Sequence, residues 1–500
     1  MSNAVSTAAP HAVTPGLAPG QNGPSVLLPL RFMVTGVLAL CIGAVVMFLR
    51  PDLLATYHYN QYVIGVTHLL VLGWLLTIVM GAMYQLVPVA LETRLYSERL
   101  ARWQFLFHVI GFAGMVWMFW TWNMKQVGHF GCVLGVGVGL FVYNLARTLA
   151  RVPRWNVIAS AVAAALVWLS LAILAGLTIA AGKCTYDSAT TATASGALGA
   201  LLRGLRSAAG FAARFDQIGA MHAHAHLGVV GVFLMLIVGI SYKLVPMFTL
   251  SELRSRWRAG GSLVLLNAGL LGSFLAIVLR SRLKLACALI VLAGLALYGV
   301  EMAAILRARK RRALDWGVKY FITAIGLLAP LSVLALVLSW PGLPLNGFTG
   351  QLENLYGFLG LLGVISFAVI GMLYKVVPFL VWYRTYSGKI GRSKVPSLAE
   401  LYCPYLQALG YWTWLAGVAA TGVGTALGRG TGVRWGCALL LLSLLTLVLN
   451  LAKMLSHLVW PRVAPLQPKA AVSAPAARPA KPETVLSAAT AGPLAGLGTR

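Results

Sequence analysis

The feature that most constrains this chain is a series of twelve long apolar segments, each near the roughly 20 residues that a helix needs to cross a bilayer. Hydrophobic residues make up 59% of the chain and charged residues 10%, whereas soluble proteins carry about 25% charged residues. The sequence therefore predicts an all-α integral membrane protein with twelve transmembrane helices. The segments lie near 31–49, 60–89, 103–122, 129–150, 157–181, 218–248, 259–279, 284–306, 317–339, 355–382, 404–424 and 434–458.

The net charge of +28 comes from short basic clusters between these segments. No basic stripe lies on a polar fold, so the charge indicates membrane lipid as the partner and excludes nucleic acid. The loops after even-numbered helices carry 19 Lys and Arg, and those after odd-numbered helices carry 11. This bias predicts a multi-pass protein of a bacterial-type cytoplasmic (inner) membrane with both termini in the cytoplasm.

Two tails and one long loop interrupt the apolar pattern. Residues 1–28 and 461–500 are rich in Ala and Pro, which predicts disordered tails around a membrane domain at 29–460. The longest loop, 182–217, contains a basic, weakly amphipathic stretch over 201–215. That stretch is predicted to lie on the membrane surface.

An eight-residue motif, G-x-x-Y-[Q/K]-[L/V]-V-P, occurs three times, at 81–88, 239–246 and 371–378. The copies fall on predicted helices 2, 6 and 10, which is every fourth helix. The chain is therefore predicted to consist of three four-helix pseudo-repeats, about 31–150, 157–306 and 317–458. The motif's Tyr and Pro suit structural roles near the membrane interface, and its Lys side chains suit snorkelling there.

Histidines mark one position of this repeat. Twenty residues before the motif Pro stand His68 in the first copy, His226 in the second and Phe358 in the third. That spacing places both imidazoles inside the membrane, toward its outer side. Each His is followed five residues later by a Gly, Gly73 or Gly231, which would let a flat cofactor approach the backbone.

His226 belongs to a cluster with His222 and His224. His222 and His226 are four residues apart and share a helix face, whereas His224 projects from another side. Imidazole suits haem iron, copper and zinc, and polar groups inside a membrane are usually functional. The alternative is hydrogen-bonded histidines without a metal. The other titratable candidates are weaker: His58, His129, His108, His457, His11, Glu301, Asp216 and Glu353.

Twelve helices in three fours, with His on helices 2 and 6, resemble subunit I of the haem–copper oxidase superfamily. The segment from His68 to Pro88 resembles helix 2 of the oxidases, the cbb3-type cytochrome c oxidases above all. The segment from His222 to Pro246 is similar to a helix of the NnrS proteins, which are linked to nitric oxide metabolism.

The resemblance implies roles for these histidines. His68 would be an axial ligand of a low-spin haem, and His226 or His222 would ligate copper. Two features of the family are missing: 259–279 lacks the adjacent His pair that binds copper, and 355–382 lacks the two haem-binding His. The usual oxidase site is therefore incomplete, and an oxidoreductase activity stays open.

These observations favour a membrane haem protein with a reduced metal site, acting in electron transfer or in nitric oxide or oxygen chemistry or sensing. Its cofactor would be a non-covalent, b-type haem, since no C-x-x-C-H motif occurs, with copper as a second candidate metal. Its axial ligands would be His68 and one of His222, His224 or His226. A c-type cytochrome or other respiratory subunits would be its partners. The alternatives are a transporter or metal-handling permease, and a non-catalytic subunit of a respiratory complex.

Overall fold

The protein was analysed as a computed structural model that describes residues 25–183 and 195–465. Every predicted apolar segment forms a helix, and three of these helices are long, with a π-helical stretch in the middle. Eleven helices in the described residues are long and apolar enough to cross a membrane. The twelfth, α16, has 23 residues and packs along α17. The chain is an all-α, multi-span membrane protein.

The three predicted pseudo-repeats follow one another along the chain. The first contains α1 (Leu27–Leu49), η1 (Pro51–Leu53), α2 (Gln61–His68), η2 (Leu69–Leu76), α3 (Thr77–Ala90), α4 (Glu98–Trp120) and α5 (Met124–Leu149). The second contains α6 (Val157–Lys183), α8 (Gly196–Ala212), α9 (Gln217–His226), η3 (Leu227–Leu234), α10 (Met235–Thr249), α11 (Arg256–Val278) and α12 (Lys284–Arg307). The third contains α13 (Trp316–Leu338), α14 (Gly347–Phe358), η4 (Leu359–Ile365), α15 (Ser366–Tyr386), η5 (Ser387–Lys389), β1 (Ser393–Lys394), η6 (Leu398–Leu401), α16 (Pro404–Ala426) and α17 (Gly430–Val459), and β2 (Ala464–Pro465) follows.

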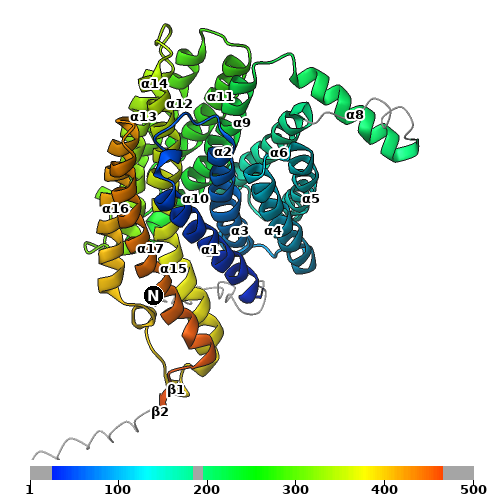
Figure 1. The fold of residues 1–500 in the computed structure, drawn as a ribbon. Helices are drawn as coiled ribbons and strands as arrows, with labels where there is room; N and C mark the ends of the chain where they lie inside the picture. Colours follow the sequence, from blue (N-terminus) through cyan, green and yellow to red (C-terminus); the bar gives the residue numbers. More distant parts are fainter. Residues whose placement is uncertain (1–24, 184–194, 466–500) are drawn as a thin grey trace, which may run out of the picture.

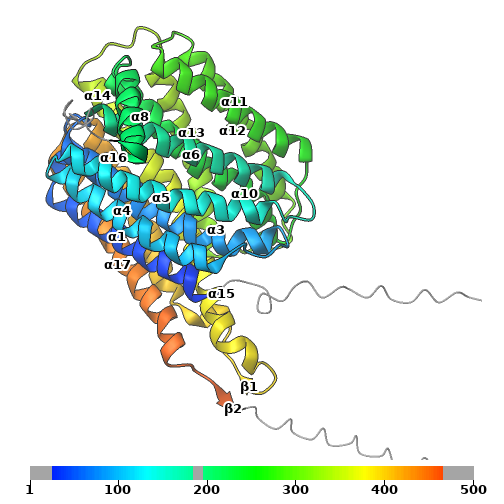
Figure 2. The same cartoon turned by 90° about the vertical axis from the view of Figure 1, so that its right-hand side faces the viewer.

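Each repeat uses the same packing scheme. Its first helix packs on its second, as α1 does on α3, and its third and fourth form an antiparallel pair, as α4 and α5 do (Figures 1 and 2). The second helices of all three repeats are the most buried, and their π-helical stretches touch in the middle of the bundle. This arrangement confirms the predicted three four-helix pseudo-repeats. Because α2, α9 and α14 all begin at one end of the bundle, we call it the histidine end.

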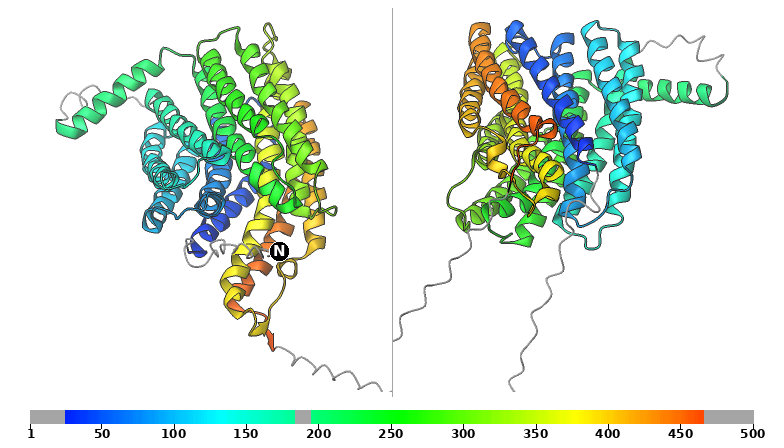
Figure 3. Two further views of the ribbon diagram at one scale, coloured as in Figure 1. Left: turned by 180° about the vertical axis from the view of Figure 1, so that it is seen from behind. Right: turned by 90° about the horizontal axis from the view of Figure 1, so that it is seen from below.

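The opposite end, where α1 begins and α17 ends, we call the terminal end (Figure 1, Figure 3). The first and last described residues therefore lie at the same end, as an even number of spans requires. Most of the predicted tails, 1–24 and 466–500, lies outside the described residues. Residues 464–465 pair antiparallel with 393–394 in a short two-stranded contact.

Glycines allow the hairpin helices to approach closely. A Cβ added at Gly111 of α4 would lie 2.5 Å from the backbone nitrogen of Leu134 in α5. A Cβ at Gly436 of α17 would likewise lie 2.4 Å from the backbone nitrogen of Thr421 in α16. No side chain fits at such distances, so backbone packs on backbone, as is common between membrane helices.

A second repeated feature ties the fourth helix of each repeat to the start of its third, at the open end of that hairpin, away from the loop that joins the two helices. The Asn144 Oδ1 accepts a hydrogen bond from the Ser97 backbone N–H (3.0 Å), and the Asn450 Oδ1 accepts one from Cys403 (2.7 Å). In the second repeat Glu301 takes this place, as its Oε1 accepts from the Ser255 N–H (2.9 Å). Glu301 is therefore a structural residue, and we call this group of contacts the clasp.

The motif residues contribute packing, as predicted, but the tyrosines lie differently from expectation. Tyr84, Tyr242 and Tyr374 are buried in the bundle instead of facing the interface, and Tyr242 Oη lies 2.7 Å from Ser262 Oγ on the neighbouring helix. Lys375 pairs with Asp315, the N-cap residue of α13.

The predicted surface stretch 201–215 falls largely on α8, which projects beside the bundle (Figure 1, Figure 3). Its Arg203 and Arg206 side chains are exposed. Contact of α8 with a membrane surface stays a prediction.

Candidate haem and metal-ligating histidines

The histidine positions precede an unusual backbone feature. His68, His226 and Phe358 are the last residues of α2, α9 and α14, and a π-helical stretch of seven or eight residues begins immediately after each one. Stretches of π-helix are rare and concentrate at functional sites. The sequence predicted regular helices here, because no local residue pattern marks a π-helix.

His68 and His224 face each other across the boundary between the first and second repeats. Their ring centroids are 6.5 Å apart and the ring planes differ by 17°. His68 also contacts Phe119 of α4, with centroids 4.7 Å apart. On the other side, the His224 ring lies over Gly176 of α6, where an added Cβ would be 3.0 Å from His224 Cε1.

The two rings differ in how their nitrogens are satisfied. Nδ1 of His68 lies 2.8 Å from the Ile64 carbonyl oxygen and donates to it, which directs the lone pair of the neutral ring to Nε2. Nδ1 of His224 is buried without a hydrogen-bond partner. Both rings are only partly covered by protein atoms, although each lies within a membrane span.

His226 has a different environment from His224. Its Nδ1 donates to the His222 carbonyl oxygen (2.7 Å), and its Nε2 lies 3.4 Å from the hydroxyl of Tyr356 on α14. The predicted division of the cluster is therefore present: His226 faces Tyr356 of the third repeat, His222 is turned toward His58, and His224 faces His68.

His222 meets His58 at the histidine end. The two Nε2 atoms are 3.0 Å apart, and Nδ1 of His58 lies 3.6 Å from a carboxylate oxygen of Glu353. Burial lowers the pKa of His58, which favours its neutral ring. The sequence places both His58 and Glu353 among the weaker candidates. His58 precedes α2, in the segment between η1 and that helix.

The remaining candidates have structural or surface positions. Nε2 of His108 is near the Thr77 hydroxyl (2.9 Å) and the Leu72 carbonyl oxygen (3.2 Å) of the first π-helical region. His457 Nδ1 bonds with the Tyr386 hydroxyl (2.7 Å), and His129 is exposed. His11 lies outside the described residues.

The predicted role of the two repeat glycines is wrong. A Cβ at Gly73 would lie 3.0 Å from atoms of Ala39 and Phe112, and one at Gly231 would lie 2.7 Å from Trp168. Neighbouring helices already occupy the space above both glycines, so they serve helix packing and leave no room for a cofactor.

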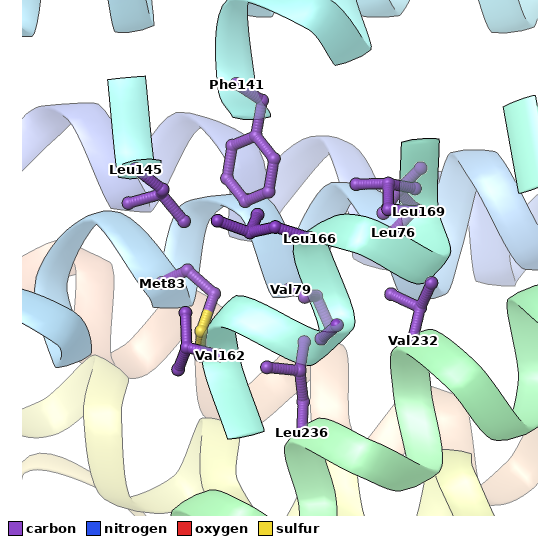
Figure 4. A pocket seen from close by; sticks show the side chains of 11 residues that line it. Leu76, Val79, Met83, Phe141, Leu145, Val162, Leu166, Leu169, Val232 and Leu236 are labelled. Carbon is purple, nitrogen blue, oxygen red and sulfur yellow. The ribbon is translucent and has the colours of Figure 1, made fainter. Parts of the chain in front are cut away.

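A small cavity lies deeper in the bundle, between the first and second repeats (Figure 4). Its lining is wholly apolar and includes Leu76, Met83 and Val232. With no polar atom to orient a ligand, it is a packing gap.

Comparisons with known proteins agree with this architecture. The family model described as "Cytochrome C and Quinol oxidase polypeptide I" matches residues 24–128, which include His68. A solved structure described as "Cryo-EM structure of a heme-copper terminal oxidase dimer provides insights into its catalytic mechanism" has the same fold, with a TM-score of 0.54 and 12% sequence identity. The match covers 87% of this chain and 82% of that chain. Residues 24–128 therefore resemble that family, and the chain as a whole has the fold of a haem–copper terminal oxidase chain.

No curated protein sequence matches the chain. The superfamily generally binds haem and copper. This chain has Phe358, a side chain that cannot ligate a metal, at the third-repeat position equivalent to His68 and His226.

Proposed function

We propose that this protein belongs to the haem–copper oxidase subunit I superfamily and is an electron-transfer protein that holds one non-covalent b-type haem between His68 and His224. The observation that carries the proposal is the pair of facing rings, 6.5 Å apart between centroids. Two imidazoles bound to opposite sides of one metal ion have ring centres about 6 Å apart, because two metal–nitrogen bonds of about 2 Å and the distance from each bound nitrogen to its ring centre add along one line. The sequence left three partners for His68 open, and this distance favours His224.

The nitrogens of the pair fit ligation. A metal-bound histidine usually donates its other N–H to a carbonyl or carboxylate, as His68 does to Ile64. The buried Nδ1 of His224 makes no hydrogen bond of standard geometry, although the ring lies close to the backbone of Ala172. One nitrogen of this ring is therefore available to a metal ion. Phe119 and Gly176 flank the two rings with apolar surface.

Two histidine ligands would favour one of the roles that the sequence left open. A haem supplies reversible one-electron chemistry at its iron. If both axial positions are taken by protein side chains, no position is left for oxygen or nitric oxide, so electron transfer is favoured over gas chemistry. The segments 259–279 and 355–382 lack the histidines that would ligate copper and haem in an oxidase site. This lack also favours electron transfer over oxygen chemistry.

Further parts of the proposal follow from the family. The electron partner would be a c-type cytochrome or another respiratory subunit, and the protein would lie in a bacterial-type cytoplasmic membrane with cytoplasmic termini. Copper, if bound, would use His226 or His222 and not the His68–His224 pair.

The test is the haem content and reduced-minus-oxidised spectrum of the purified full-length protein. We expect about one b-type haem per chain, and loss of haem or of its low-spin bands in His68→Ala and in His224→Ala. His226→Ala is the matched control, since this ring lies on the same helix but faces Tyr356. Haem retained in both test variants and lost in the control would refute the assignment, and a haem-free wild type would refute the function.

A further inference from the structure

A second cluster of ligating side chains lies outside the proposed haem pair. One ligand atom each from His58, His222 and Glu353 falls within 4.8 Å of the others. The three residues come from three different repeats, and they meet where the second helices of these repeats start. The cluster therefore joins all three repeats at the histidine end.

Separate contacts hold each member in place. The Asn354 side chain donates to the Thr56 carbonyl oxygen (2.5 Å), which fixes the loop of His58 against α14, the helix that carries Glu353. Asp216 caps α9 through the Gly219 N–H (2.8 Å) and pairs with Arg280 (2.8 Å). These hydrogen bonds and this ion pair position the segments that carry the three side chains without using the contacts between those side chains.

A hydrogen bond between the two rings explains only part of this geometry. It would use the Nε2 atoms of His58 and His222, which are 3.0 Å apart. It would leave the Glu353 carboxylate without a role, although its side chain is only 29% exposed and one of its oxygens lies 3.6 Å from Nδ1 of His58.

A metal ion would use all three groups. Nitrogens bound to one tetrahedral ion with bonds of about 2.0–2.1 Å lie about 3 Å apart, which is close to the observed separation. Two imidazoles and one carboxylate are a ligand set that Zn²⁺ accepts with one position left open. Other divalent first-row metals bind the same donors.

We propose that His58, His222 and Glu353 form a binding site for one divalent transition-metal ion of the Zn²⁺ type, which links the three repeats at the histidine end. The site is distinct from the haem pair, since His222 and His224 project from different sides of α9. An ion bound there would stabilise the folded bundle, because the unfolded chain does not hold the three groups together.

The experiment uses full-length protein in detergent, stripped with a chelator and equilibrated with Zn²⁺. Bound zinc is measured by elemental analysis and by competition with a zinc indicator. We expect about one equivalent in the wild type, and affinity lowered at least ~10-fold in His58→Ala, His222→Ala and Glu353→Gln, since even outer-shell changes cost that much. Zinc should also raise the melting temperature of the wild type and not that of the variants.

His129→Ala is the matched control, because His129 is exposed and makes no part of the cluster. Its zinc affinity should equal that of the wild type. Wild-type protein without bound zinc, or zinc retained equally by the three test variants, would overturn the proposal. Glu353 is far in the sequence from His68 and His224, so the Glu353→Gln variant should keep its haem. The haem content of this variant therefore serves as a check that it is folded. A protein that binds zinc but no haem would refute the proposed function and leave this site standing.

Discussion

Removing the Glu301 carboxylate should destabilise the protein more than any other single change in the clasp. Glu301 is fully buried and accepts three hydrogen bonds: from the backbone N–H groups of Arg254 (2.6 Å) and Ser255 (2.9 Å), and from Nε of Arg258 (2.7 Å). Glu301→Ala leaves two buried backbone donors and one guanidinium without their acceptor. Breaking a buried ion pair on one side costs about 3–5 kcal/mol, so we expect a loss of that size.

The other repeats set the scale for this loss. Asn144 accepts from the Ser97 N–H (3.0 Å) and donates to the Ser97 carbonyl (2.8 Å), and both bonds are between neutral groups. A neutral hydrogen bond contributes about 0.5–1.5 kcal/mol, so Asn144→Ala should cost roughly 1–3 kcal/mol. Glu301→Gln keeps an oxygen for the backbone donors and should fall between the two alanine variants.

The assay is the free energy of unfolding in mixed micelles of increasing denaturing detergent, followed by tryptophan fluorescence. Glu252→Ala is the control, because Glu252 is an exposed glutamate in the same loop. If the free energy of unfolding of Glu301→Ala is within about 1 kcal/mol of that of this control, the reasoning is refuted. Removing a buried acceptor of three hydrogen bonds should cost more than that.

Two further substitutions test close packing. Gly176→Leu should displace the His224 ring, whose Cε1 would be 3.0 Å from the new Cβ, so haem content should fall while the protein stays monodisperse; unchanged haem would contradict the placement of this ring beside the cofactor. Gly111→Ala should lower the melting temperature because its Cβ would lie 2.5 Å from the Leu134 nitrogen. A Cβ at Gly139 would have nothing within 4 Å, so Gly139→Ala should leave the melting temperature unchanged or raise it slightly through helix propensity. Equal changes of melting temperature in Gly111→Ala and Gly139→Ala would contradict the packing argument.

The fold was predictable because hydrophobicity and a repeat are long-range signals. Each predicted segment is long enough to average out local exceptions, and the recurrence at 81–88, 239–246 and 371–378 placed the second helix of each repeat. The same repeat selected His68 and His226. It could not show that a π-helical stretch follows each of them, since this change of hydrogen-bonding register depends on packing and leaves no residue pattern.

The candidate sites depend on contacts between repeats, which helical spacing alone does not reveal. Spacing separated His224 from the face of His222 and His226, but it could not show that His224 meets His68. The sequence did contain a signal for the metal cluster. His58, His222 and Glu353 all stand near the starts of the second helices, and a threefold bundle brings those starts together at its axis. The repeat glycines were predicted to lie beside a cofactor, and they pack against neighbouring helices instead. The sequence does not show whether the space above a glycine such as Gly73 is open or filled by another helix.

The most direct test of the central claim is the coordination state of the wild-type haem. We predict that the oxidised protein gives the electron paramagnetic resonance signal of a low-spin, six-coordinate haem. We also predict that carbon monoxide leaves the reduced spectrum unchanged, because His68 and His224 occupy both axial positions. A high-spin signal together with a carbon monoxide adduct would show an open iron position and contradict the two-histidine site.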